Sequence, residues 1–147
     1  MNQGLYRLSL FKFSSRNSFI QNLKPCVLEF DPQVEEAQDF KYIIITLKET
    51  LLDQIPSEPV HLVRGSPKCK YHMNILEDFI AKELRGDKVQ YDARCTHGGG
   101  RVRVNTPSIQ VYGFSQAFGR ANHRVAAEII KKVYPQFEVS YEQNMAQ

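Results

Sequence analysis

His72 is the side chain best placed for proton transfer. It precedes Leu76 by one turn of a helix expected at residues 66–84, so it leans toward the buried side and lies near the N-terminal end of that helix. The helix macrodipole and partial burial both disfavour the imidazolium form there, and both lower the pKa of the imidazole. A histidine that stays neutral near neutral pH can act as a general base. A packed or capping histidine is the more common case at a helix start, and that alternative stays open.

A compact turn follows an apolar run and precedes a second helical pattern. The stretch 111–119 reads VYGFSQAFG, with Ser115, Gln116 and Ala117 between its two glycines. A strand, a tight turn and a helix start in this order can direct backbone N–H groups at one point, where the helix adds positive partial charge. The stretch therefore predicts an anion cradle for phosphate. A turn of this kind is a weak signal alone, and an ordinary strand-to-helix connection is the more common structure.

Basic side chains near the expected strands can supply positive charge. Lys41 interrupts the apolar run at 40–47, Arg64 ends a short strand at 60–65, and Arg101 follows three consecutive glycines. A lysine offers a compact charge to an anion, and an arginine can hold it with a bidentate fork. For Lys41 and Arg64, a solvent-exposed side chain at a strand end is the more common case.

The elements that must position these side chains alternate between strand and helix. We expect strands at 40–47, 60–65, 88–95, 101–104, 109–114 and 137–141, with a turn or bulge at 96–100. Residues 40–47 are apolar on both faces and predict a central strand, whereas the strands at 101–104 and 109–114 predict an antiparallel hairpin. Prolines 25 and 32 argue against a regular element before residue 39.

Two helices complete the expected α/β (α+β-like) fold. In the helix at 66–84, Ser66 is the expected N-cap, and the buried face consists of Met73, Leu76, Phe79, Ile80 and Leu84. The second helix opens at residue 120, and its buried face consists of Val125, Ala126, Ile129, Ile130 and Val133. His123, in the first turn of that helix, faces either the same pocket as Ser115 or the solvent.

Length and composition indicate one globular domain. The chain has 147 residues, of which 42% are hydrophobic and 24% charged, and its three cysteines form no C-x-x-C pair, which indicates a reducing compartment. A net charge of +3 without a clustered basic stripe argues against a nucleic-acid partner, and no apolar run is long enough to span a membrane. Histidines and acids show neither H-x-H nor H-E-x-x-H spacing, so we expect no metal and no cofactor.

The first 38 residues differ from the rest. Residues 1–28 contain Arg7, Lys12, Arg16 and Lys24 and no acid, with serines and apolar residues between the bases. This composition is that of a mitochondrial presequence, although a basic, loosely ordered extension that targets nothing is the more common case. We therefore expect an extension at 1–38 and a domain at 39–147. The expected location is the cytoplasm, or the mitochondrion if the extension is a presequence.

Six short motifs together resemble the phosphohistidine phosphatase / janus family. They are F-K-Y at 40–42, V-R-G at 63–65, Y-H at 71–72, G-G-G-R at 98–101, V-Y-G-x-S-x-A-x-G at 111–119, and His123 followed by Y-P-x-F-E-V at 134–139. None is specific alone, but their shared order and spacing distinguish the pattern from a chance match.

The resemblance implies both a fold and a reaction. The fold is a compact domain with a mixed, largely antiparallel sheet and two helices, and the reaction is metal-independent hydrolysis of the P–N bond of phosphohistidine in proteins. His72 matches the catalytic proton acceptor, Lys41 the substrate-binding lysine, and residues 115–117 the segment that holds the phosphoryl group. Arg64 and Arg101 match arginines around the pocket. The expected partners are phosphohistidine-bearing proteins, the expected state is a monomer, and the insect branch implies a setting in sex differentiation or the germ line.

Two departures from the family leave a second function open. Phe114 and Phe118 stand where family members often carry tyrosine, and residues 68–70 replace a more aromatic and acidic segment. Neither change removes a proposed catalytic group. The alternative function is a catalytically weak regulatory or phospho-binding module on the same scaffold. A covalent phosphohistidine on His72 is the open mechanistic alternative.

Overall fold

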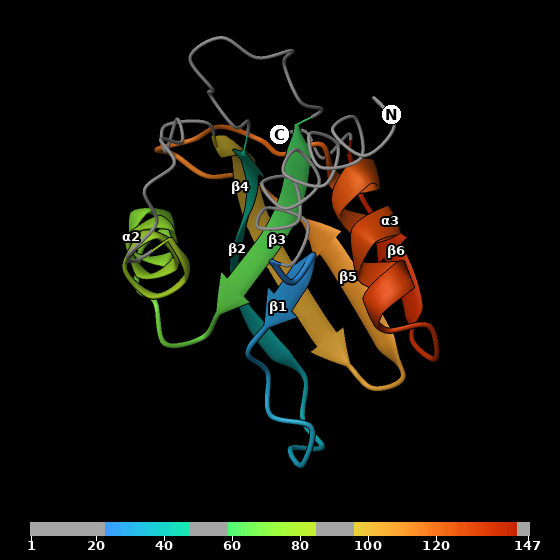
Figure 1. Cartoon of the computed structure of the whole chain (residues 1–147). Coiled ribbons are helices and arrows are strands. Elements are labelled where there is room, and N and C mark those ends of the chain that lie inside the picture. The colour runs from blue at the N-terminus through green and yellow to red at the C-terminus, as the bar shows by residue number, and fades with distance from the viewer. Residues whose placement is uncertain (1–22, 48–58, 85–95, 144–147) are drawn as a thin grey trace, which may run out of the picture.

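A computed structural model describes residues 23–47, 59–84 and 96–143 of the chain (Figure 1). The presequence-like residues before 23 and the whole strand expected at 88–95 lie outside these described residues. In the described part, no helix is long and apolar enough to cross a membrane.

Six described strands form one mixed sheet in the order β1-β3-β2-β4-β5-β6. They are β1 (Cys26–Leu28), β2 (Gln38–Leu47), β3 (Val60–Ser66), β4 (Thr96–Asn105), β5 (Ser108–Tyr112) and β6 (Glu138–Tyr141). The pairs β2–β3, β2–β4 and β4–β5 are antiparallel, whereas β1 pairs with β3 and β6 with β5 in parallel. The predicted mixed, largely antiparallel sheet is confirmed, and so is the hairpin of β4 and β5.

β2 is buried on both faces of the sheet: from Tyr42 to Leu47, every residue is buried, and successive side chains point to opposite faces. Tyr42 and Ile44 belong to one apolar cluster, with residues of α3 (His123–Val133), and Ile43 and Ile45 belong to another, with residues of α2 (His72–Glu83). Since successive side chains of a strand point to opposite faces, the two helices cover opposite faces of the sheet (Figure 1). This arrangement confirms the prediction that residues 40–47 form a central strand.

α2 begins five residues later than the expected N-cap at Ser66 implies. Ser66 instead ends β3 and pairs with Lys41, and its hydroxyl accepts a hydrogen bond from the N–H of Lys68 at 3.1 Å. Tyr71 is the residue before the helix, and the Asn74 side chain accepts its N–H at 3.0 Å. His72 is therefore the first residue of α2, at the positive end of its dipole.

The buried face of α2 is also rotated from the expected one. His72, Ile75, Leu76 and Phe79 are buried, whereas Met73 and Ile80 are 43% and 37% exposed. The sequence contains apolar residues on both sides of Leu76 and Phe79, so the pattern leaves the exact rotation undetermined. The consequence is that His72 faces the sheet and Met73 faces outward.

Three further boundaries differ from the expectation. Residues 96–100 continue β4 as strand, and the expected irregularity is a register shift opposite Ile43 and Ile45. α3 begins at His123, because Asn122 caps it by accepting a hydrogen bond from the N–H of Val125 at 3.3 Å. β1 lies in the segment where no regular element was expected, so the sheet extends to residues before 39.

Candidate active site

A cleft opens on the sheet face that carries α2, at the N-terminal end of that helix. Its volume is about 660 Å³, which suits a small ligand or a modified side chain, and nine residues line it: Lys41, Lys70, Tyr71, His72, Met73, Arg101, Phe114, Gln116 and Ala117. The cleft thus brings together five of the predicted site residues: Lys41, His72, Arg101, Gln116 and Ala117.

The two cations of the cleft come from neighbouring strands. Lys41 of β2 lies directly opposite Arg101 of β4, and Arg101 lies opposite Tyr112 of β5. Residues directly opposite one another in antiparallel strands share a face, so this row of side chains points to the side of α2. The charges of Lys41 and Arg101 are felt at His72, where both act to lower the pKa of the imidazole.

His72 is oriented by the backbone of β4. Its Nε2 lies 2.9 Å from the carbonyl oxygen of Gly100, and the residue is only 8% exposed. A carbonyl oxygen can only accept, so Nε2 carries the proton and Nδ1 of the neutral ring is left with its lone pair. Burial is the main cause that lowers the pKa of His72, opposed by the bond to Gly100 and reinforced by Lys41 and Arg101. The predicted lowering of this pKa is confirmed.

Glycines 99 and 100 let the histidine reach this carbonyl. A Cβ atom on Gly99 would lie 2.9 Å from Cδ2 of His72, and one on Gly100 would lie 2.6 Å from Cε1 of His123. Both distances are shorter than side chains tolerate. The triglycine stretch of β4 is therefore thin enough for one imidazole to pack on each face of the sheet.

A closed loop forms another wall of the cleft. Ser115 and Gly119 exchange two backbone hydrogen bonds of 3.0 and 2.7 Å, and the buried hydroxyl of Ser115 accepts the N–H of Phe118 at 3.0 Å. Among the described residues, none accepts a hydrogen bond from the N–H of Gln116 or Ala117. Both residues line the cleft, and these N–H groups have no acceptor among the described residues with which a ligand would compete, as the predicted anion cradle requires.

The start of α3 does not contribute to this cradle in the expected way. Its first N–H, that of His123, donates to Oε1 of Gln143 at 2.8 Å, and that of Val125 donates to the Asn122 side chain. The N–H groups of His123 and Val125 therefore have partners within the protein, and the predicted anion cradle is left to the loop alone.

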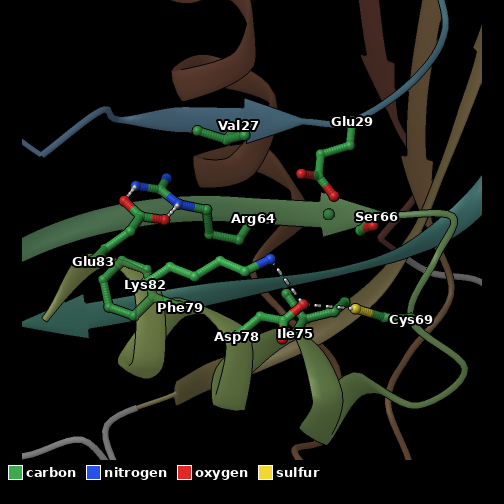
Figure 2. A pocket seen from close by; sticks show the side chains of 11 residues that line it. Val27, Glu29, Arg64, Ser66, Cys69, Ile75, Asp78, Phe79, Lys82 and Glu83 are labelled. Carbon is green, nitrogen blue, oxygen red and sulfur yellow. Dashed lines mark hydrogen bonds and ion pairs between the residues drawn. The ribbon is translucent and has the colours of Figure 1, made fainter. Parts of the chain in front are cut away.

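Arg64 lies outside the cleft. Its Nε and Nη2 bind both carboxylate oxygens of Glu83 at 2.9 and 2.8 Å, its guanidinium carbon is 5.2 Å from the Phe79 ring centre, and it is only 4% exposed. It lines a separate crevice of about 60 Å³ between β1, β3 and α2 (Figure 2). A crevice of this size holds a few water molecules, and the charge of Arg64 is compensated there.

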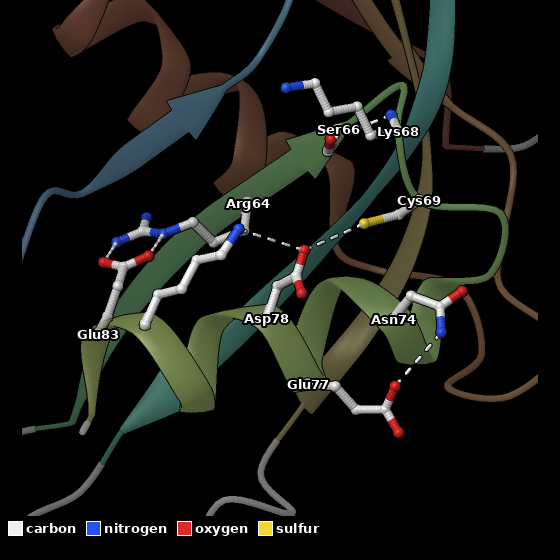
Figure 3. A network of polar contacts seen from close by, with 9 residues as sticks. Arg64, Ser66, Lys68, Cys69, Asn74, Glu77, Asp78 and Glu83 are labelled. Carbon is white, nitrogen blue, oxygen red and sulfur yellow. Dashed lines mark hydrogen bonds and ion pairs between the residues drawn. The ribbon is translucent and has the colours of Figure 1, made fainter.

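A second group of polar contacts in this crevice also involves α2. Asp78 accepts from the thiol of Cys69 at 3.7 Å and pairs with Lys82 at 3.7 Å, beside the Arg64–Glu83 pair (Figure 3). The acids and bases along this side of the helix therefore bind one another. We accordingly leave Arg64 out of the proposed site.

His123 lies on the opposite face of the sheet and is fully buried, so it faces neither the cleft nor the solvent. Its Nε2 donates to the carbonyl oxygen of Gly113 at 2.8 Å, and its Nδ1 accepts from the Tyr42 hydroxyl. Burial lowers the pKa of His123 and raises that of Tyr42, so both groups are neutral. This pair supports the backbone of β4 and the start of the loop from behind.

Two residues beside Arg101 were missed in the sequence. Asp39 accepts a hydrogen bond from Nε of Arg101 at 2.7 Å, and it accepts another from the hydroxyl of Tyr112. Asp39 was taken only as the start of the domain. Asp39 lies two residues before Lys41 on the same strand, so both side chains point to the same face of the sheet. This spacing could have identified Asp39 as a neighbour of the site.

The chain is similar in sequence to known proteins over most of its length. The model of the Janus/Ocnus family matches residues 30–138. The 14 kDa phosphohistidine phosphatase of Homo sapiens is 33% identical over 114 residues, which are 76% of this chain and 88% of that protein. The sex-regulated protein janus-A of Drosophila pseudoobscura pseudoobscura is 34% identical over 110 residues, which are 72% of this chain and 70% of that protein. The resemblance carried by the six motifs is confirmed, and the chain belongs to the Janus/Ocnus family.

Proposed function

We propose that this protein is a protein phosphohistidine phosphatase that works without a metal ion, with His72 as its general base. The observation that carries the proposal is the hydrogen bond from His72 Nε2 to Gly100, which leaves Nδ1 as a proton acceptor beside two cations in an open cleft. The similarity to a human protein named phosphohistidine phosphatase supports the choice of substrate.

The side chains of the cleft suit a phosphoryl group. Lys41 and Arg101 supply positive charge to its non-bridging oxygens, and the N–H groups of Gln116 and Ala117 donate to the same oxygens. Phosphoryl transfer passes through a loose transition state, so positioning and charge compensation account for most of the catalysis. These cations can provide the charge that a metal ion provides in other phosphatases.

The reaction requires one proton acceptor on the water side. Water attacks phosphorus and gives a proton to Nδ1 of His72. The P–N bond breaks, its electron pair stays on the imidazole nitrogen of the substrate, and that nitrogen receives the proton that His72 took from water, which returns His72 to its neutral form. The products are inorganic phosphate and the unmodified histidine of the substrate protein.

Phosphate release from a phosphohistidine-bearing peptide, with and without EDTA, tests the substrate and the metal independence together. We expect release that is enzyme-dependent and unchanged by EDTA, with no release from a matched phosphoserine peptide. Loss of release in EDTA contradicts metal independence. A folded protein that binds inorganic phosphate and releases none from the peptide contradicts the enzyme and favours a phospho-binding module.

The covalent alternative needs a separate readout. With substrate labelled in its phosphoryl group and the reaction quenched in alkali, where phosphohistidine is stable, we expect no label on the protein. Label found on His72 would show that this residue acts as a nucleophile and not as a general base.

We also infer a sex-dependent setting for the protein, since one of its relatives is named as sex-regulated. Transcript levels compared between males and females of the source organism test this, and equal levels contradict it.

A further inference from the structure

Arg101 reaches the cleft from a cluster that spans three neighbouring strands. Its Nε donates to Oδ1 of Asp39 at 2.7 Å, and the hydroxyl of Tyr112 donates to Oδ2 of the same carboxylate. Asp39 lies on β2, Arg101 on β4 and Tyr112 on β5. Arg103 is a more distant neighbour, with Nη1 at 4.0 Å from Oδ2 of Asp39. One carboxylate therefore receives donors from two adjacent strands.

The cluster restrains a side chain that would otherwise sample many rotamers. The side chain of Arg101 is 38% exposed and that of Asp39 27%, so neither is fixed by burial alone. The bond at Nε restrains the plane of the guanidinium without using its terminal nitrogens on Asp39, and the Tyr112 hydroxyl is a second polar neighbour of the group. Among the described residues, no acceptor other than the groups of Asp39 and Tyr112 is found for this guanidinium.

We propose that Asp39, held by Tyr112, is a positioning residue that orients Arg101 for binding the phosphoryl group. This role rests on the proposed function of the cleft. Asp39 does not line the cleft itself and acts only through the guanidinium that does. Its loss therefore matters only while Arg101 is present.

Simple electrostatics predicts the opposite effect of removing Asp39. A carboxylate close to a phosphate site repels the anion, so its removal alone strengthens binding. Orientation of Arg101 makes the same removal weaken binding, because a free guanidinium must lose its rotamer freedom when the anion arrives. The sign of the change thus separates the two accounts.

The test is the affinity for inorganic phosphate, measured by calorimetry on the full chain. We expect Asp39→Ala to weaken binding about fivefold and Arg101→Ala about tenfold, with the double variant no weaker than Arg101→Ala. Glu128→Ala, which removes a carboxylate from the exposed side of α3, is the control for net charge and leaves the affinity unchanged. Unchanged or tighter binding by Asp39→Ala overturns the proposal, as does a double variant whose losses add.

A milder variant protects the test against misfolding. Tyr112→Phe removes only the hydroxyl that holds Asp39, and we expect it to weaken phosphate binding in the same direction by about twofold. In turnover, Asp39→Ala should raise KM more than it lowers kcat, which general loosening of the fold would not do selectively. Unaltered KM in both variants contradicts the positioning role.

The outcomes also separate this role from the proposed function. If wild-type protein binds phosphate but releases none from a phosphohistidine peptide, the proposed phosphatase activity is contradicted. The phosphate affinities of the single and double variants still test the role of Asp39. If folded wild-type protein does not bind phosphate, both the proposed phosphatase function and the positioning role of Asp39 are contradicted.

Discussion

The bond between His72 and the Gly100 carbonyl determines which imidazole nitrogen carries the proton. The tautomer follows from the acceptor and not from the imidazole, because a carbonyl oxygen has no proton to give. Burial and the neighbouring charges of Lys41 and Arg101 then keep the ring neutral by lowering its pKa. At the scale of a single residue, the structure therefore shows an oriented, neutral imidazole, which is the state that the proposed general base requires.

The pH dependence of turnover reports this state. We expect kcat/KM to fall on the acid side with a midpoint below 6.5, the ordinary pKa of histidine, because protonation of the buried His72 removes the base. Initial rates of phosphate release across the acid range, corrected with an enzyme-free blank for spontaneous P–N cleavage, give the midpoint. A midpoint at or above 6.5 would mean that His72 is not a buried neutral base.

Individual residues were predicted unevenly from the sequence. The resemblance to the family selected Lys41, His72, Arg101, Gln116 and Ala117, and these five residues line one cleft. Arg64 is also a basic residue of a strand, but it binds Glu83 of α2. Whether these two side chains meet depends on how α2 packs across β3, and no local sequence pattern determines this. Long-range pairs such as Tyr42–His123 have no local signal.

β4 is the element on which the site depends most. Its glycines allow two histidines to pack on opposite faces of one strand, and its next residue is Arg101. The sequence predicted a turn or bulge there, because three glycines favour turns when no neighbours are considered, and the structure shows a register shift opposite Ile43 and Ile45 within a continuous strand. Pairing of Gly99 and Gly100 with β2 on one side, and the bridge between Gly99 and Arg120, keep the segment extended.

A side chain at position 100 should disrupt both the sheet and the site. In Gly100→Ala, the added carbon would lie 2.4 Å from the Tyr112 carbonyl oxygen and 2.6 Å from Cε1 of His123. We expect a loss of about 2–4 kcal/mol in the free energy of unfolding, measured with urea, because both neighbours are held in place. The matched variant Gly119→Ala meets open space but has a positive φ of 83°, so we expect a smaller cost of about 1 kcal/mol. Equal stability of Gly100→Ala and wild type contradicts this packing.

The start of α2 shows why element boundaries were less predictable than elements. Serine before proline is a common helix start, but here Ser66 is paired with Lys41 at the end of β3. Strand pairing therefore decides where the helix can begin. Because the helix begins later than expected, His72 is the first residue of α2 and not a residue of its middle. In this position its side chain binds the backbone of β4.

At the scale of the whole molecule, two neutral histidines, His72 and His123, pack against β4 from opposite faces of the sheet. Burial is the main cause that lowers the pKa of both His72 and His123. Each residue is therefore easier to protonate in the unfolded chain than in the folded one. Folding then depends on pH in the range where the two states differ in bound protons.

Acid should destabilise the fold for this reason. A lowered pKa in the folded state means that stability is fully present above 6.5, the ordinary histidine value, and is lost as pH falls below it. We expect the free energy of unfolding in urea to be smaller at about pH 5.5 than at about pH 7.5, by up to about 1.4 kcal/mol per histidine and pH unit. NMR titration of the two imidazoles identifies the groups responsible. Stability that is constant or higher in acid contradicts their burial as neutral groups.

The central claim is that His72 accepts the proton in phosphate release, and one comparison tests it most directly. Release from a phosphohistidine-bearing peptide is measured for wild type, His72→Ala and His97→Ala, with urea unfolding of each as the check on folding. His97 is an exposed histidine of the same strand that carries Gly100, and it does not line the cleft. The account predicts that folded His72→Ala loses turnover by about a hundredfold or more, whereas His97→Ala retains it. Turnover by folded His72→Ala at the wild-type rate would contradict the account.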